Sequence, residues 1–161
     1  MSSLLTEIMT GAEGRYLTPQ ESDTLRDYVR GFDARLSAAS EVEEKEQVVC
    51  ERATRAIMSA YPDYEKNHPG AYEKSVRDLS LVLRYSTQAL VLGSKDRLDE
   101  CLLLWFSTIL RGLGFTQAFI QDTYGALEDA LRAELSPTTY QAVSPYVSHA
   151  RNVLSSKAAV N

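Results

Sequence analysis

Residues 72–93 read YEKSVRDLSLVLRYSTQALVLG, and this stretch decides the fold. Its apolar residues fall on more than one side of a helix, so it predicts a central, largely buried helix from about Tyr72 to Leu92. Gly93 follows directly, where a glycine commonly ends a helix. The preceding segment, 62–71, has two prolines and a glycine and is predicted to be a loop.

The segments on both sides of this helix also favour helices. No clear run alternates apolar and polar residues, so the sequence predicts an all-α protein. Thr18, Pro19 and Glu21 form the pattern of a capping box with proline at the first helical position. Further helices are expected at about 4–13, from residue 19 to about 36, and at about 40–60, 96–110, 117–134 and 136–154.

Length and composition limit the class of protein. The chain has 161 residues, which fits one domain spanning 1–161. Its net charge of −5, with scattered positive residues, argues against a nucleic-acid partner. The most apolar stretch, near 102–110, is about half of the ~20 residues that a membrane span needs, so no transmembrane segment is expected. No basic leader is visible, and a cytoplasmic location is predicted.

The sequence contains no motif of a known catalytic site. A glycine-rich phosphate loop, GxSxG and HExxH are all missing. Two histidines (His68 and His149) and two cysteines (Cys50 and Cys101) supply too few ligands for a metal framework. We therefore predict that the chain is not an enzyme and holds no metal.

Arg77-Asp78, in the first turns of the central helix, is the most informative polar pair. One interpretation is a solvated charge pair in which Asp78 benefits from the helix dipole. The other is a functional site. Composition alone favours the first interpretation.

Several segments together resemble the phycobiliprotein family, most of all its allophycocyanin branch. They are Gly14–Pro19, Pro69–Tyr72, Arg77–Leu79, Leu83–Thr87, Ala89–Gly93, Leu98–Glu100, Leu113-Gly114 and Val143–Leu154. The resemblance implies a globin-like fold with two extra N-terminal helices used for subunit pairing, here residues 1–35. It also implies a linear tetrapyrrole (bilin) as cofactor.

One departure from the family concerns the attachment of the pigment. Val76 stands where the family has the cysteine that links the bilin, so the resemblance predicts non-covalent binding of a phycocyanobilin-like pigment. Asp78 matches the family's carboxylate for the pyrrole N–H groups, and Arg77 matches a partner of the propionates. Arg84 also matches, in either a pigment or a subunit contact. Tyr72 lies in the loop on the chromophore side, and the candidate wall of the pocket is Trp105, Phe115, Phe119 and Tyr124.

The resemblance implies light harvesting in a phycobilisome or bilin carriage. A pigment-free structural or regulatory relative is an alternative. So is a haem-binding globin, although no histidine falls where a proximal ligand is expected. The implied partners are a second copy or another phycobiliprotein subunit, and a phycobilisome core or linker protein. Such an assembly would lie at the cytoplasmic face of the thylakoid.

Overall fold

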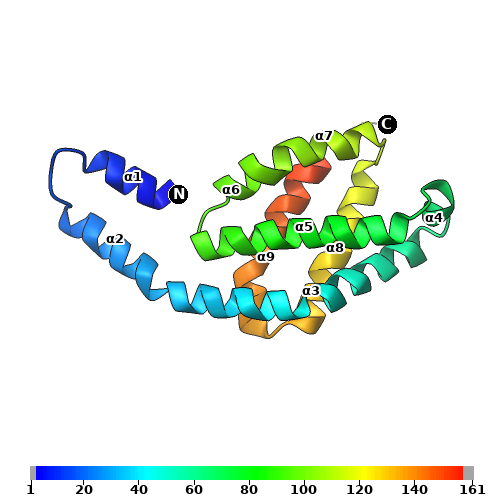
Figure 1. Cartoon of the computed structure of the whole chain (residues 1–161), viewed down its shortest axis with the longest axis horizontal. Helices are drawn as coiled ribbons and strands as arrows, with labels where there is room; N and C mark the ends of the chain where they lie inside the picture. Colours follow the sequence, from blue (N-terminus) through cyan, green and yellow to red (C-terminus); the bar gives the residue numbers. More distant parts are fainter. Residues whose placement is uncertain (1–2, 158–161) are drawn as a thin grey trace.

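The computed structural model describes residues 3–157, and every regular element in this range is helical (Figure 1). The elements, in chain order, are α1 (Ser3–Gly11), α2 (Pro19–Arg30), α3 (Phe32–Ala60), α4 (Tyr64–Asn67), α5 (Ala71–Leu92), α6 (Asp96–Leu98), the π-helical segment η1 (Asp99–Leu103), α7 (Leu104–Gly112), α8 (Gln117–Glu134) and α9 (Pro137–Ser156). The prediction of an all-α fold is confirmed.

Helix α5 is central, as its sequence predicts. It packs against α3 and α9, and α3 in turn packs against α8 (Figure 1). Val82, Leu83 and Ala89 of α5 are fully buried. They meet Val49 and Ala53 of α3 in one apolar core, which the other helices complete. Each buried aliphatic side chain contributes about 1.5–3 kcal/mol, so this core supplies most of the stabilisation of the bundle.

The predicted break between the second and third helices is in the wrong place. The break was expected at residues 36–40, whereas α3 runs without interruption from Phe32 to Ala60 and the boundary is Gly31. Gly31 has an ordinary right-handed backbone. A Cβ there would lie 2.8 Å from Nη1 of Arg35, so a larger residue would require the end of the Arg35 side chain to move.

Two smaller differences concern the other helices. The predicted loop 62–71 contains the single turn α4. The helix expected at 96–110 consists of α6, η1 and α7 in succession and ends at Gly112. As expected for the helix at 136–154, Pro145 lies inside α9, which runs from Pro137 to Ser156.

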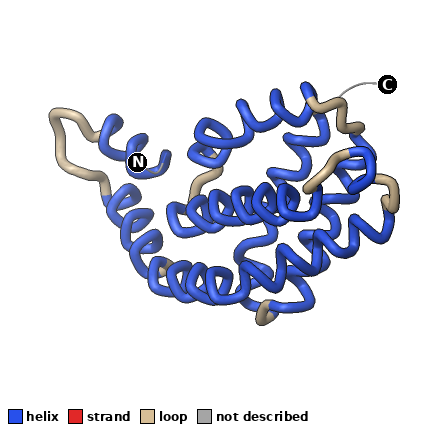
Figure 2. The backbone as a smooth tube through the Cα atoms, turned by 45° about the vertical axis from the view of Figure 1, so that its right-hand side comes forward, coloured by secondary structure: helices blue, strands red, loops and turns tan. Residues whose placement is uncertain are grey.

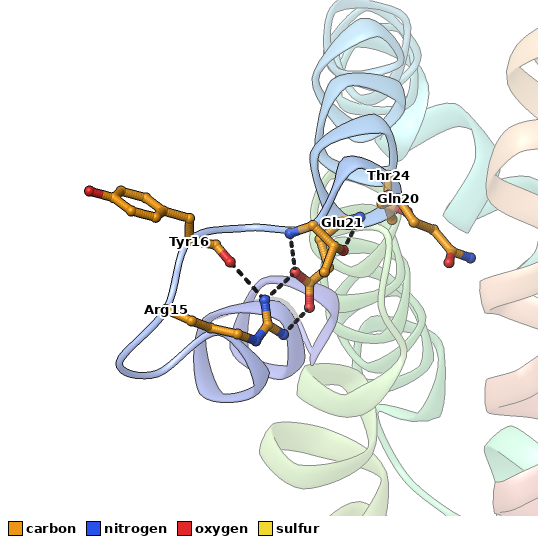
Figure 3. Close-up of polar contacts among 6 residues, drawn as sticks. Arg15, Tyr16, Gln20, Glu21 and Thr24 are labelled. Carbon is orange, nitrogen blue, oxygen red and sulfur yellow. Dashed lines mark hydrogen bonds and ion pairs between the residues drawn. The ribbon is translucent and has the colours of Figure 1, made fainter.

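Helices α1 and α2 form an N-terminal arm, residues 3–30, that projects from the bundle (Figures 1 and 2). Figure 3 shows how α2 begins: Arg15 forms an ion pair with Glu21 at 2.8 Å and donates to the carbonyl of Tyr16. Glu21 also accepts from the backbone N–H of Thr18, which closes the predicted capping box. Arg15 lowers the pKa of Glu21 to about 2.

Candidate functional site

A small cavity lies between α4, α5, α7 and α8. Its volume is about 40 Å³. Of the predicted site residues, it brings together Asp78, Phe115, Phe119 and Tyr124. The remaining lining residues are Tyr64, Ser75, Leu79, Phe106, Leu110, Ile120 and Thr123. The cavity is therefore apolar, with a carboxylate, phenols and hydroxyls at defined points of its wall.

Asp78 is the only carboxylate among the residues that line this cavity. Arg77 donates to Oδ1 of Asp78 from both Nε, at 2.9 Å, and Nη2, at 2.8 Å. Both bonds end on Oδ1, so the second oxygen, Oδ2, is not used by this ion pair. The Asp78 side chain is 31% exposed and that of Arg77 is 72% exposed. Asp78 thus stands at the boundary between the cavity and solvent, with its counter-ion outside.

Two tyrosines share the negative environment of Asp78. Burial raises the pKa of the Tyr124 hydroxyl, and the charge of Asp78 raises it further. Burial also raises the pKa of Tyr64, with a further contribution from Asp78, while a hydrogen bond with Ser75 acts in the opposite direction. Both phenols therefore stay protonated and keep an O–H group as a hydrogen-bond donor beside the carboxylate.

An aromatic cluster closes one side of the cavity. Phe115 and Phe119 are stacked, with ring centroids 4.9 Å apart. The ring centroid of Tyr64 lies 4.8 Å from that of Phe119. His68 lies 5.5 Å from Phe115. Beyond this cluster is a second, more open cavity of about 400 Å³, which also borders Tyr64, His68, Phe115 and Phe119. Three shared rings, Tyr64, Phe115 and Phe119, therefore divide a larger space into two compartments.

The other predicted site residues lie outside the small cavity. Arg84 forms a two-bond ion pair with Glu46 of α3, at 2.6 and 2.8 Å, and faces a different groove. Trp105 is 46% exposed on α7 and donates to the carbonyl of Cys101. Tyr72 accepts from Arg55 at 3.4 Å. Val76 packs against the core without lining the cavity.

Sequence reasoning missed Tyr64 and Ser75 as members of the wall. Ser75 is three residues before Asp78 on α5 and therefore shares its helical face, a signal that was available from spacing. Tyr64 lies in a segment interpreted as a loop, and nothing in its neighbours indicates that it reaches the core.

The histidines and cysteines are accounted for by their surroundings. Nε2 of His149 on α9 lies 2.7 Å from Oδ1 of Asp99 in η1. Burial raises the pKa of the Cys50 thiol to about 11, which makes it a poor nucleophile. Within residues 3–157 there is no cluster of three or more His, Cys, Asp or Glu side chains suited to a metal ion. Nor is any helix in that range long and apolar enough to cross a membrane.

The comparison with protein families matches the sequence profile described as "Phycobilisome protein" over residues 9–154. The chain therefore belongs to the phycobilisome protein family. This family has a globin-like fold, binds bilins and forms subunit assemblies, and both the predicted resemblance and the predicted fold are confirmed. Its members are non-enzymatic light-harvesting proteins, which confirms the prediction that this chain is not an enzyme.

Individual relatives come from the allophycocyanin branch. The chain is 25% identical to the allophycocyanin alpha-B chain of Cyanophora paradoxa, with 89% of this chain and 93% of that one covered. It is 27% identical to the allophycocyanin alpha-B chain of Cyanidium caldarium, with 88% and 90% covered. It is 30% identical to allophycocyanin subunit beta-18 of a Nostoc species over 63% of each chain.

Proposed function

We propose that this protein binds a linear tetrapyrrole non-covalently, as an allophycocyanin-like light-harvesting subunit or a bilin carrier. The position of Asp78 carries the proposal. Its carboxylate lies at the edge of an aromatic cavity, and Oδ2 is not engaged by Arg77. Such an oxygen is suited to accept from pyrrole N–H groups and to favour the protonated pigment. Arg77, largely exposed beside it, is placed to turn toward a propionate.

Val76 determines the mode of binding in this proposal. A valine has no nucleophilic atom, so a thioether at this position is chemically impossible. The pigment is then held by the charged pair, by the phenols of Tyr64 and Tyr124 and by stacking on Phe115 and Phe119. Pockets that enclose drug-sized ligands are about 300–1,000 Å³, so the rings that separate the two cavities must move aside for a tetrapyrrole.

A second candidate function is a pigment-free structural subunit. The volume of the small cavity, about 40 Å³, favours it, because the protein's own aromatic side chains already fill the space beside Asp78. Co-expression with the enzymes of bilin synthesis, followed by a visible spectrum, separates the candidates. Red absorption that co-purifies with the protein supports the first, and a colourless protein supports the second. A Soret band would indicate the haem-binding alternative.

Two further measurements test the details of pigment binding. Denaturation of the coloured protein in acidic urea should release the pigment from the chain. Asp78→Asn keeps the size of the side chain but removes its charge, so we expect weaker binding or a blue-shifted, broader band. Asp129→Asn changes an exposed carboxylate of α8 and serves as the control. Identical spectra for the two variants would exclude the role assigned to Asp78.

We also propose that the chain, as a single domain spanning 1–161, pairs through residues 1–35 with a second copy or a related subunit. Leu25 and Val29 form an apolar patch on α2, and Val29 is 67% exposed. A groove of about 590 Å³ lies between α3 and α5, lined by apolar residues such as Val42 and Val91 with Glu43 at its rim.

The arm and the groove belong to the same chain, so a two-fold pair can place each arm in the groove of the other copy. Arg26 and Arg30 lie beside the apolar patch, and each forms an ion pair with an aspartate of α2, so apolar contact is the main support for this pairing. The pair would work in the cytoplasm, with a phycobilisome core or linker protein as the next partner at the thylakoid surface. Each buried aliphatic side chain would contribute about 1.5–3 kcal/mol before the costs of association.

Sedimentation at micromolar concentration tests the pairing. Val29→Glu places a charge in the apolar patch and should convert the dimer to a monomer. Val48→Glu is the matched control, because Val48 is also exposed but lies in the second half of α3. Removal of residues 1–13 should weaken pairing as well. A wild-type protein that sediments as a monomer of about 18 kDa would contradict the proposal.

A further inference from the structure

The joint between the N-terminal arm and the bundle is made by Arg35, the fourth residue of α3. Its Nε donates to the carbonyl of Val91 at 3.0 Å, and its Nη2 donates to the carbonyl of Tyr28 at 2.9 Å. The guanidinium also stacks over the ring of Tyr28, 4.6 Å from the ring centroid. One side chain therefore contacts α2 and the last turn of α5 at the same time.

Tyr28 makes a second connection to the same end of α5. Its hydroxyl donates to the carbonyl of Leu92 at 3.2 Å. Its ring lies over Gly93, where a Cβ would come within 3.5 Å of the ring. The carbonyls of Val91 and Leu92 belong to the last turn of α5, where no following helical N–H is available. A cation at this point is also favoured by the helix dipole.

Gly31 provides a separate observation on the same joint. A Cβ at Gly31 would lie 2.8 Å from Nη1 of Arg35, well inside the usual contact distance. Its backbone is right-handed helical, a conformation that any residue adopts. A Cβ at this position would therefore require the end of the Arg35 side chain to shift from its present place at the joint.

Polar contacts hold the arm at this joint more than burial does. None of the residues of α2, all of which lie in the described part of the chain, is buried. Within the apolar patch, Val29 is 67% exposed and Leu25 is half-buried.

We propose that Arg35 is a positioning residue for subunit pairing. Together with Tyr28 it anchors the arm to the C-terminal end of α5 and fixes the direction in which α2 presents its apolar patch to a second copy of this chain. This inference rests on the pairing proposed above. The groove between α3 and α5 ends at Val91 and Leu92, so the anchor also fixes the arm relative to the groove that receives the partner's arm. Preorganisation of this kind lowers the entropic cost of association.

The test measures the direction of the arm and the pairing separately. Spin labels on Gln20→Cys of α2 and Lys95→Cys after α5 report the distance between arm and bundle in full-length protein with Cys101→Ser. Cys50 is buried, so it does not take the label. We expect a narrow distance distribution that Arg35→Ala broadens. We also expect Arg35→Ala to raise the dimer dissociation constant about tenfold, the effect of releasing a preorganised segment.

One control variant and three possible results decide whether Arg35 positions the arm. Arg55→Ala removes another guanidinium of α3, far along the helix from the joint, and should change neither quantity. Unchanged distances and an unchanged dissociation constant in Arg35→Ala would overturn the inference. If Arg35→Ala does not fold, Tyr28→Phe removes only the bond to Leu92 and should broaden the distances less. A wild-type monomer with a narrow distribution would contradict the pairing but leave the anchor supported.

Discussion

Glu41 of α3 caps the start of α9, and its removal gives a defined loss of stability. Its carboxylate accepts from the backbone N–H and, at 2.7 Å, from the hydroxyl of Ser136, and also from the hydroxyl of Thr139. Hydrogen bonds to a charged group contribute about 1.5–3 kcal/mol each, and bonds to one carboxylate are not additive. Glu41→Gln keeps one oxygen that can accept a hydrogen bond. Its amide NH₂ replaces the other oxygen and faces donors of Ser136 or Thr139, with which it cannot form the same bonds. We expect the free energy of unfolding to fall by about 2 kcal/mol.

The same contact predicts how the loss depends on pH. The bonds from Ser136 and Thr139 lower the pKa of Glu41 in the folded protein. A lowered pKa stabilises the folded state at pH values above the unfolded pKa of about 4.3, and this contribution is lost as the pH falls through the folded pKa. The difference between wild type and Glu41→Gln should therefore be largest near neutral pH and shrink in acid.

Urea unfolding followed by far-UV circular dichroism, repeated from neutral to acidic pH, measures both effects. Near neutral pH the loss corresponds to a fall in Tm of roughly 4–8 °C for a chain of this size. Glu44→Gln, an exposed carboxylate on the same helix, is the control. A Glu41→Gln protein as stable as this control, or a difference that grows in acid, would refute the assigned role of Glu41.

Five further substitutions probe the pocket, the core with an exposed control, and two helix positions. Phe115→Ala removes one of the two rings proposed to stack on the pigment and should decrease the bilin retained on a desalting column, and equal retention would contradict this stacking role. Leu127→Ala, in the core, should lower the free energy of unfolding by about 2–5 kcal/mol, whereas the exposed Leu113→Ala should change it by less than about 0.5 kcal/mol. Gly93→Ala forces a φ of 64° on alanine and should cost about 1–2 kcal/mol in the same urea assay. Pro145→Ala, inside α9, should raise stability by about 1–3 kcal/mol, and a loss would show that the proline is needed there.

Helical periodicity and capping residues predicted most of the helices, because the apolar faces that they define are the faces that pack in the core. The apolar residues of 72–92 predicted the central helix, and Thr18 with Glu21 predicted the start of α2. The end of α2 was misplaced because apolar residues at helical spacing continue past Gly31 to Phe32 and Leu36, and this periodicity conceals the boundary at Gly31.

The sequence predicted some residues of the candidate site and misplaced others, because it does not show the direction in which a side chain points. Asp78, Phe115, Phe119 and Tyr124 border one cavity, whereas Arg84 does not. Arg84 follows Asp78 by six residues, which turns it about 240° around α5 and away from the cavity toward Glu46 of α3. The resemblance to the family identified two residues of α5, Asp78 and Arg84. Only the structure shows that their side chains point in different directions.

The anchor of the N-terminal arm has a consequence for biosynthesis. Val91, which holds Arg35, is made 56 residues after it. At roughly 5–20 residues per second, the ribosome reaches Val91 about 3–11 s after Arg35. During this interval Arg35 has no carbonyl of α5 to bind. A nascent chain therefore acquires its pairing geometry only after α5 has been made, and a partner that binds through this geometry cannot recognise the arm earlier.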